Sequence, residues 1–270
     1  MHNARVFISM FMIRLRTVLQ YRTAAWAGVL TQFAWGFMYV MLYRAFYDSS
    51  SAVQPISLSQ LTSYIWLQQA FLAFIMIWFR DNELANMITG GAIAYELARP
   101  VDLYTLWYAR LLGQRIAQAS LRCLPILFVA ALLPKPYALG APGSFVSLLL
   151  FIPTLLLGVC LMVSLSMLVY ATMFKTMNAT GSHAVFAVFV EFLSGNIIPV
   201  PLMPAWMQKI IYLLPFRFVS DFPFRVYSGN IPPMEALFGL FQQLFWLAVV
   251  IALGKFLFSR LLRGVVIQGG

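Results

Sequence analysis

This chain of 270 residues has few charged side chains and few of the residues that carry out chemistry. Charged residues make up 10% of the sequence, whereas soluble domains usually contain roughly 25%. Its two histidines, His2 and His183, lie far apart with no cysteine or carboxylate at ligand spacing, which argues against a metal site. The sequence also lacks a Gly-x-x-x-x-Gly-Lys-Ser/Thr phosphate loop. We therefore expect that the chain does not bind ATP in the usual cradle.

The remaining candidate nucleophiles form no catalytic arrangement. Cys123 and Cys160 both lie within long apolar runs, so we interpret them as small apolar core residues and not as a disulfide or metal site. Serines are frequent in the same runs, where small polar residues usually mediate helix packing. No base stands beside any of them in the sequence. We expect no catalytic residue and no cofactor bound by this chain.

Apolar residues, in contrast, are abundant, at 62% of the sequence. They form repeated runs of about 20 residues, long enough for a helix to cross the hydrocarbon core of a membrane. The predicted fold is an all-α integral membrane protein in which residues 1–270 form a single transmembrane domain. The six predicted transmembrane helices cover residues 24–46, 60–79, 111–133, 145–172, 181–198 and 236–258.

Basic residues predict the orientation, because they accumulate on the cytoplasmic side of membrane proteins. One side of the predicted topology carries Arg5, Arg14, Arg16, Arg22, Arg80, Arg99, Arg110, Arg115, Lys175, Lys255, Arg260 and Arg263. The other side carries Arg44, Lys135, Lys209, Arg217 and Arg225. This bias places both termini in the cytoplasm. We attribute the net charge of +10 to it and to attraction for anionic membrane lipid, not to nucleic-acid binding.

Residues 1–23 predict a helix that lies in the cytoplasmic membrane interface. The polar leader is too long for a cleavable signal, and the apolar run that follows is long enough to span. Arg14 falls outside the polar stripe of this helix. The stripe itself is formed by Arg5, Ser9, Arg16 and Gln20.

Residues 199–223 are almost wholly apolar but are interrupted by proline, so they cannot cross a membrane as one helix. They predict a re-entrant hairpin on the outer side, with a short helix at residues 204–214 followed by a turn at Pro215 and Phe216. The interrupting prolines are Pro199, Pro201, Pro204, Pro215 and Pro223. One face of the short helix carries Trp206, Ile210, Ile211 and Leu214. Such a hairpin is suited to form the outer wall of a transport pathway.

Glu191 is a carboxylate within the predicted fifth span. An ionisable group inside a membrane is costly, so it should face a cavity or a partner. It could contact substrate or relay protons; alternatively it is a hydrogen-bonded packing residue near Asn196. The candidate substrate-pathway residues in the second and fifth spans are Gln68, Gln69, Phe71, His183, Glu191 and Asn196.

The cytoplasmic connection at residues 81–104 predicts a short amphipathic helix. Asp81 is placed to cap it, Glu83 is favourable in its first turn, and Gly90 and Gly91 end it. Its apolar face carries Leu84, Met87 and Ile88. Such a helix could dock into a groove of another protein or rest on lipid headgroups, and periodicity alone does not decide between the two.

Two patches of sequence resemble type-2 ATP-binding-cassette (ABC) exporter permeases, in particular the bacterial branch of small six-span subunits. The first patch is Ile88-Thr89-Gly90-Gly91-Ala92-Ile93 through Leu97-Ala98-Arg99-Pro100-Val101-Asp102. The second patch is Ser194-Gly195, Pro199, Pro204-Ala205-Trp206, Leu214-Pro215-Phe216 and Phe222-Pro223. Both occur in the order expected for the family, and the six-span plan covers essentially the whole chain.

The resemblance implies a membrane subunit that pairs with a second permease subunit, different or identical, in the bacterial inner membrane. Two separate cytoplasmic ATPase subunits would bind ATP and Mg²⁺, and residues 81–91 would be the coupling helix that docks on them through Leu84, Met87 and Ile88. ATP-driven export by alternating access is the implied mechanism. Two alternatives remain open: a proton-coupled secondary transporter that uses Glu191, and a structural subunit of a membrane complex.

Overall fold

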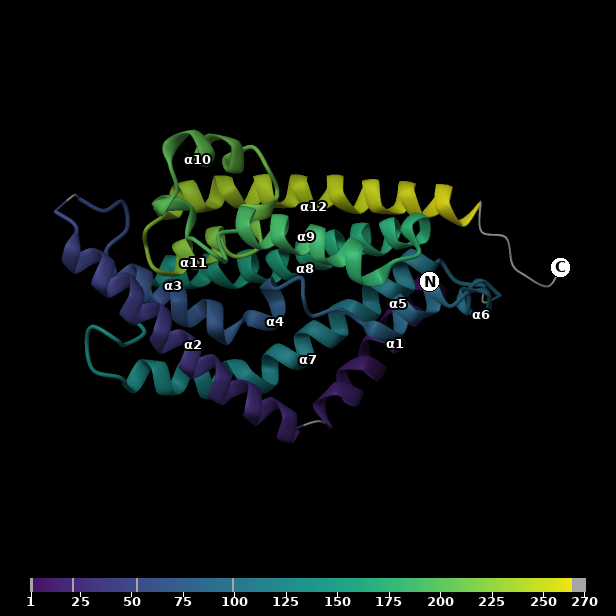
Figure 1. The fold of residues 1–270 in the computed structure, drawn as a ribbon, viewed down its shortest axis with the longest axis horizontal. Helices are drawn as coiled ribbons and strands as arrows, with labels where there is room; N and C mark the ends of the chain where they lie inside the picture. The colour runs from purple at the N-terminus through teal and green to yellow at the C-terminus, as the bar shows by residue number, and fades with distance from the viewer. Residues whose placement is uncertain (1, 21, 52, 99, 264–270) are drawn as a thin grey trace.

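The computed structural model describes residues 2–20, 22–51, 53–98 and 100–263, and all regular secondary structure in these residues is helical. Within these described ranges, four helices are long and apolar enough to cross a membrane: α2 (Arg22–Ser49), α7 (Leu103–Leu132), α8 (Phe145–Thr176) and α12 (Pro233–Leu262). Helices α8 and α12 run side by side along the long axis of the molecule, whereas α2 and α7 run at a tilt to them (Figure 1).

Helix α8 occupies the centre of the bundle. Half of its most apolar stretch (50%) is buried within the protein, against 22–28% for the other three long helices. Gly158 of α8 lets the backbone of the loop at Phe218 and Val219 approach, since a Cβ atom there would lie 2.9 Å from the carbonyl oxygen of Val219. The other long helices therefore keep large apolar surfaces outside this subunit.

The predicted second span at residues 60–79 is not one helix. Helix α3 (Leu58–Ala70) is followed by one short turn, α4 (Leu72–Ile75), and residues 76–81 are not helical. Helix α9 (Ala179–Leu193), in the predicted fifth span, contains 15 residues, about 22 Å of rise, which is less than the ~30 Å hydrocarbon thickness. Six continuous spans therefore stay a prediction.

The N-terminal helix predicted within residues 1–23 is present as α1 (His2–Leu19), which packs across α7, and its position in the membrane interface stays a prediction. The two approach closely at Gly113, where a Cβ atom would come within 2.7 Å of the Phe11 carbonyl oxygen. The predicted polar stripe of Arg5, Ser9, Arg16 and Gln20 is exposed. Arg14, which falls outside the stripe, turns toward α5 (Asn82–Thr89).

The two ends of the molecule differ. Helices α5 and α6 (Ile93–Leu97), the start of α1 and the end of α12 gather at one end, and α10 and α11 lie at the other (Figure 1). Arg99, which belongs to the first family patch, lies outside the described residues. Cys123 and Cys160 are free thiols and are partly buried.

The predicted outer hairpin is more elaborate than one helix and a turn. It contains η1 (Val200–Leu202), α10 (Ala205–Tyr212), η2 (Phe216–Phe218) and α11 (Asp221–Tyr227). The short helix α10 begins after Pro204 and η2 begins after Pro215, as the prolines predict.

Two details of that prediction are wrong. The helix ends at Tyr212, so Leu214 lies beyond it and is not part of its apolar face. Pro223 does not break the chain but lies in the first turn of α11, where a missing N–H costs no helical hydrogen bond.

Candidate coupling site

Helix α5 begins and ends as the sequence predicts. The Asp81 carboxylate accepts hydrogen bonds from the backbone N–H groups of Glu83 (3.0 Å) and Leu84 (3.2 Å), which satisfies two donors of the first turn. At the other end, the Gly90 N–H donates to the Asn86 carbonyl at 2.8 Å, and Gly91 follows with φ = +75°, a conformation that favours glycine. Local sequence therefore determines this helix.

The apolar face of α5 points into the subunit, which corrects the predicted docking surface. Leu84 and Ile88 are 0% and 3% exposed and belong to the same core cluster as α8, and Met87 packs against that cluster partly buried. Periodicity identifies an apolar face but not what covers it, and here the chain's own core does. The exposed side of the α5–α6 segment consists of Asn82, Glu83, Asn86, Gly90, Gly91 and Tyr95.

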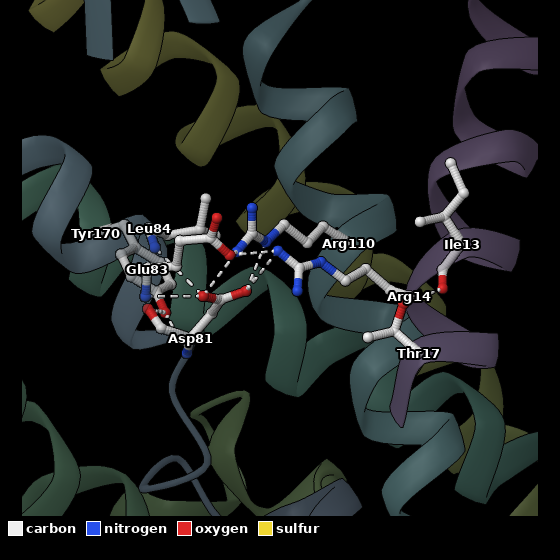
Figure 2. A network of polar contacts seen from close by, with 8 residues as sticks. All are labelled: Ile13, Arg14, Thr17, Asp81, Glu83, Leu84, Arg110 and Tyr170. Atoms are coloured by element: carbon white, nitrogen blue, oxygen red, sulfur yellow. Dashed lines mark hydrogen bonds and ion pairs between the residues drawn. The ribbon is translucent and has the colours of Figure 1, made fainter. Parts of the chain in front are cut away.

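A buried ion pair fastens α5 to α7. The Arg110 guanidinium grips the Asp81 carboxylate with two hydrogen bonds, from Nε to Oδ2 at 2.5 Å and from Nη2 to Oδ1 at 2.9 Å (Figure 2). Both side chains are buried, at 7% and 6% exposure. Arg110 also contacts Glu83, whose carboxylate reaches solvent. A bidentate pair of this kind fixes orientation as well as distance.

Side chains of two further helices, α1 and α8, also contact the start of α5 (Figure 2). Arg14 of α1 donates to Glu83 at 2.6 Å, and its Nη2 atom lies 3.9 Å from Asp81. The Tyr170 hydroxyl of α8 accepts from the Asp81 N–H at 2.9 Å and donates to the Asp81 carbonyl at 3.2 Å. The hydrogen bond from Arg14 and the positive charge of Arg110 lower the pKa of Glu83 below its ordinary value.

Together, Asp81, Glu83, Arg14, Arg110 and Tyr170 form what we call the coupling node. It joins the first turn of α5 to α1, α7 and α8. Separating Asp81 from Arg110 would leave buried charges without partners, which costs several kcal/mol. The node therefore fixes the position of α5 relative to α7 and α8.

A second polar cluster stabilises the helix interruption after α4. The Glu191 carboxylate is 4% exposed; one oxygen accepts from the Ile77 N–H at 2.9 Å and the other from the Asn196 side chain at 2.8 Å. Gln68 donates to the Asn196 carbonyl at 2.5 Å. The structure therefore brings three predicted pathway residues together, but it buries them inside the subunit. This geometry favours the packing interpretation of Glu191.

Arg115, a residue that the sequence analysis treated only as a marker of orientation, completes this cluster. It is 1% exposed, and its Nη1 atom donates to the carbonyls of Ala73 (2.9 Å) and Met76 (2.8 Å) while Nη2 donates to the Ser166 hydroxyl (3.1 Å). At the same interruption, Arg115 donates hydrogen bonds to free backbone carbonyls and Glu191 accepts one from a free backbone N–H. Cations and anions stabilise the free carbonyls and N–H groups at helix ends in the same way. The position of Arg115 inside the predicted span 111–133 was the sequence feature that could have indicated this buried role.

The other predicted pathway residues lie around this cluster. Gln69 is buried, and His183 packs edge-to-face against Trp78 with ring centroids 5.6 Å apart. Phe71 is partly buried and stacks on Phe74. Within the described ranges, no three His, Cys, Asp or Glu side chains are grouped so that they could hold a metal ion.

Comparison with known families identifies the class of protein. The family model described as ABC-2 family transporter protein matches residues 33–269, so the chain belongs to this family. It is a multi-pass membrane protein and a membrane subunit of an ABC transporter, which confirms the resemblance found in the sequence. Membership also implies association with ABC ATPase subunits. No curated protein matches the chain.

Proposed function

We propose that this chain is the permease subunit of an ATP-driven ABC exporter, powered by two cytoplasmic ATPase subunits and paired with a second permease subunit. ATP and Mg²⁺ would bind on the ATPases. The observation that carries the proposal is the coupling node, which fastens a short exposed helix to the long helices α7 and α8. Such an arrangement has an evident use in a protein whose energy source lies on another chain.

In this proposal the ATPase contacts the polar side of α5, around Asn82, Asn86 and Gly90, and not Leu84 or Ile88. ATP-driven closure of the ATPase pair displaces α5, and the node passes the displacement to α7 through Arg110 and to α8 through Tyr170. ATP shifts the balance of membrane states only if the ATPases bind the two states with different affinity. A stiff connection between α5 and the bundle provides that difference.

The membrane arrangement that we propose has six crossings in the bacterial inner membrane, with the interrupted α3–α4 segment and α9 as the second and fifth. Both termini and α5 lie on the cytoplasmic side, and α10 and α11 lie outside. The excess of basic residues near the termini supports this orientation. Helix α5, the start of α1 and the end of α12 lie at the same end of the molecule, which is consistent with this orientation (Figure 1).

Exposed apolar residues on α9 support the second permease subunit. Val185, Val188 and Phe189 are 60%, 60% and 62% exposed on one side of this helix. An apolar helix side at membrane depth is satisfied by lipid or by another helix. A partner that covers α9 would enclose the pathway between the two subunits. Glu191 lies on the inner side of the same helix and has both oxygens hydrogen-bonded, which gives the proton-relay alternative little support.

The test is co-expression of the full chain with the ABC ATPase that co-purifies with it, followed by reconstitution and measurement of ATP hydrolysis. Asn86→Arg places a bulky cation on the exposed face of α5 without touching the node. Ala205→Arg makes the same type of change on exposed α10 and is the matched control. We expect Asn86→Arg to reduce permease-dependent ATPase activity at least tenfold and the control to leave it unchanged. Equal activity of the two variants would refute the proposed docking face.

A further inference from the structure

A second feature with binding chemistry lies at the end of the bundle opposite α5. It is an open cavity of about 400 Å³ between the η2–α11 region and the first turns of α12. Its walls combine opposite charges with aromatic rings and an amide. The residues that matter for its chemistry are Arg217, Arg225, Glu235, Tyr212, Phe238 and Gln242.

Arg217 is the cation of this cavity that forms no direct ion pair within the described residues. Its guanidinium lies 4.6 Å from the ring centre of Tyr212 and 4.4 Å from that of Phe218. Nη2 donates to Gln242 at 3.0 Å, whereas Nε is buried without a hydrogen-bond partner. Among the described residues, no carboxylate lies within ion-pairing distance of it. The buried Asp221 carboxylate attracts Arg217 but forms its ion pair with Arg225, so Arg217 retains N–H donors for an anionic ligand.

Arg225 differs from Arg217, because the protein already compensates its charge. It pairs with the fully buried Asp221 at 3.3 Å and donates to Asn230 at 2.7 Å. Glu235 is the counterpart of Arg217: it is exposed in the first turn of α12, and its side chain makes no hydrogen bond or ion pair within the described part of the chain. The cavity therefore presents one cation without a direct ion pair, Arg217, and one exposed carboxylate, Glu235, which is a dipolar arrangement.

The surface next to the cavity is apolar and follows a membrane-spanning helix. Phe238, Phe241 and Phe245 of α12 are 66%, 61% and 62% exposed, and they continue from the cavity along the helix. The first turns of a spanning helix lie at the membrane interface. A ligand that fills the cavity and continues along this surface must have a polar head and an apolar tail.

We infer that this cavity is a binding site for the headgroup of a zwitterionic phospholipid. The phosphate would pair with Arg217, whose fork of donors suits phosphate geometry. The ammonium group would lie near Glu235 and the faces of Tyr212 and Phe238, which attract cations. The acyl chains would lie along the exposed phenylalanines of α12. This site is independent of the ATPase and of the proposed coupling face.

The experiment is native mass spectrometry of the purified full-length chain titrated with dioleoyl phosphatidylethanolamine and, separately, dioleoyl phosphatidylglycerol. We expect the ethanolamine lipid to bind more tightly to the unmodified protein. Arg217→Gln should weaken its binding about tenfold or more, because a charge-assisted contact is lost. Lys209→Gln, which removes a charge from exposed α10 outside the cavity, should leave binding unchanged. Glu235→Gln should abolish the preference for ethanolamine while binding of the glycerol lipid persists.

Three outcomes overturn the inference. Equal binding of both lipids to the unmodified protein excludes recognition of the ammonium group. Equal effects of Arg217→Gln and Lys209→Gln exclude the cavity as the site. Competition by inorganic phosphate as strong as by soluble glycerophosphoethanolamine assigns the cavity to free phosphate and not to lipid. If Arg217→Gln does not elute as a monodisperse protein, Arg217→Lys takes its place, with loss of the forked contact again expected to weaken lipid binding.

Discussion

Replacing Arg110 by methionine should detach α5 from the bundle. Methionine fills similar space without charge, so the change isolates the ion pair. The Asp81 carboxylate would remain buried, with its two backbone donors and with Arg14 as the nearest cation at 3.9 Å. Removing one partner of a buried pair costs about 3–5 kcal/mol. The lost contact with Glu83, which is 64% exposed, adds at most about 1 kcal/mol.

A cost of about 3 kcal/mol corresponds to roughly a hundredfold increase in the population of the open segment, because 1.4 kcal/mol is a factor of ten. Hydrogen exchange measured by mass spectrometry on the full chain in nanodiscs reports this opening directly. The amides of α5 should exchange about a hundred times faster in Arg110→Met, while those of α8 change much less. In the double variant Asp81→Asn/Arg110→Met, asparagine still caps the helix and neither charge of the pair remains. The exchange rate of the α5 amides should therefore return part of the way to that of the unmodified protein.

Arg44→Met is the matched control. It breaks an arginine–aspartate pair with Asp48 at 3.6 Å whose side chains are 41% and 68% exposed, and such pairs contribute less than about 1 kcal/mol. It also removes the hydrogen bond from Arg44 to the Tyr137 hydroxyl at 2.7 Å, so it measures the effect of destabilisation outside the node. Unchanged exchange of α5 in Arg110→Met would refute the role of the node. Equal loss of protection in Arg44→Met would show that α5 responds to general destabilisation.

Three other expectations follow from the contacts of Glu191, Leu84 and Glu83. Glu191→Leu removes the acceptor of the Ile77 N–H and of the Asn196 amide and should cost about 1–3 kcal/mol for each donor left unpaired. Glu191→Gln keeps one acceptor oxygen for one of these donors but turns an N–H toward the other. Thermal unfolding should therefore show a smaller effect for Glu191→Gln than for Glu191→Leu, and equal effects would contradict the hydrogen-bonding role. Leu84→Ala should lower thermal stability by about 2–5 kcal/mol because the side chain is fully buried, and loss of ATPase binding without loss of stability would restore the docking role instead. The pKa of Glu83 is lowered in the folded protein, so its contribution to stability is present above the ordinary value of 4.5 and is lost as pH falls below it. Glu83→Gln should therefore reduce the fall of the melting temperature at acid pH. An unchanged fall would show that other carboxyl groups produce it.

Local features of the coupling segment were predictable from the sequence. Asp81 as a cap, Gly90 as an end and the proline-delimited helix α10 each depend on a few neighbouring residues, and the structure confirms them. The direction of α5 was not predictable, because Leu84 and Ile88 mark an apolar face whose cover depends on residues far along the chain. The helix break after Ala70 was not predictable either, because residues 71–79 stay apolar without proline or glycine.

Most of the long-range contacts that the sequence did not predict involve arginines. Arg14, Arg110 and Arg115 all served as orientation markers in the sequence, and their number on one side was informative in that role. Their partners are 69, 29 and 42 residues away for Glu83, Asp81 and Ala73 respectively. Such pairings arise only when α1, α7 and the interrupted segment pack together. Arg14 gave a weak cue, because it fell outside the polar stripe of α1.

The central claim is that the polar face of α5 contacts the ATPase. The most direct test places a photo-activated cross-linking residue at Asn86 in the full chain, co-expressed with its ATPase, and at Lys209 on α10 as the control. We predict a covalent product with the ATPase from position 86 and none from position 209. An intact permease–ATPase complex that gives no product at position 86, or equal products from both positions, would contradict the account.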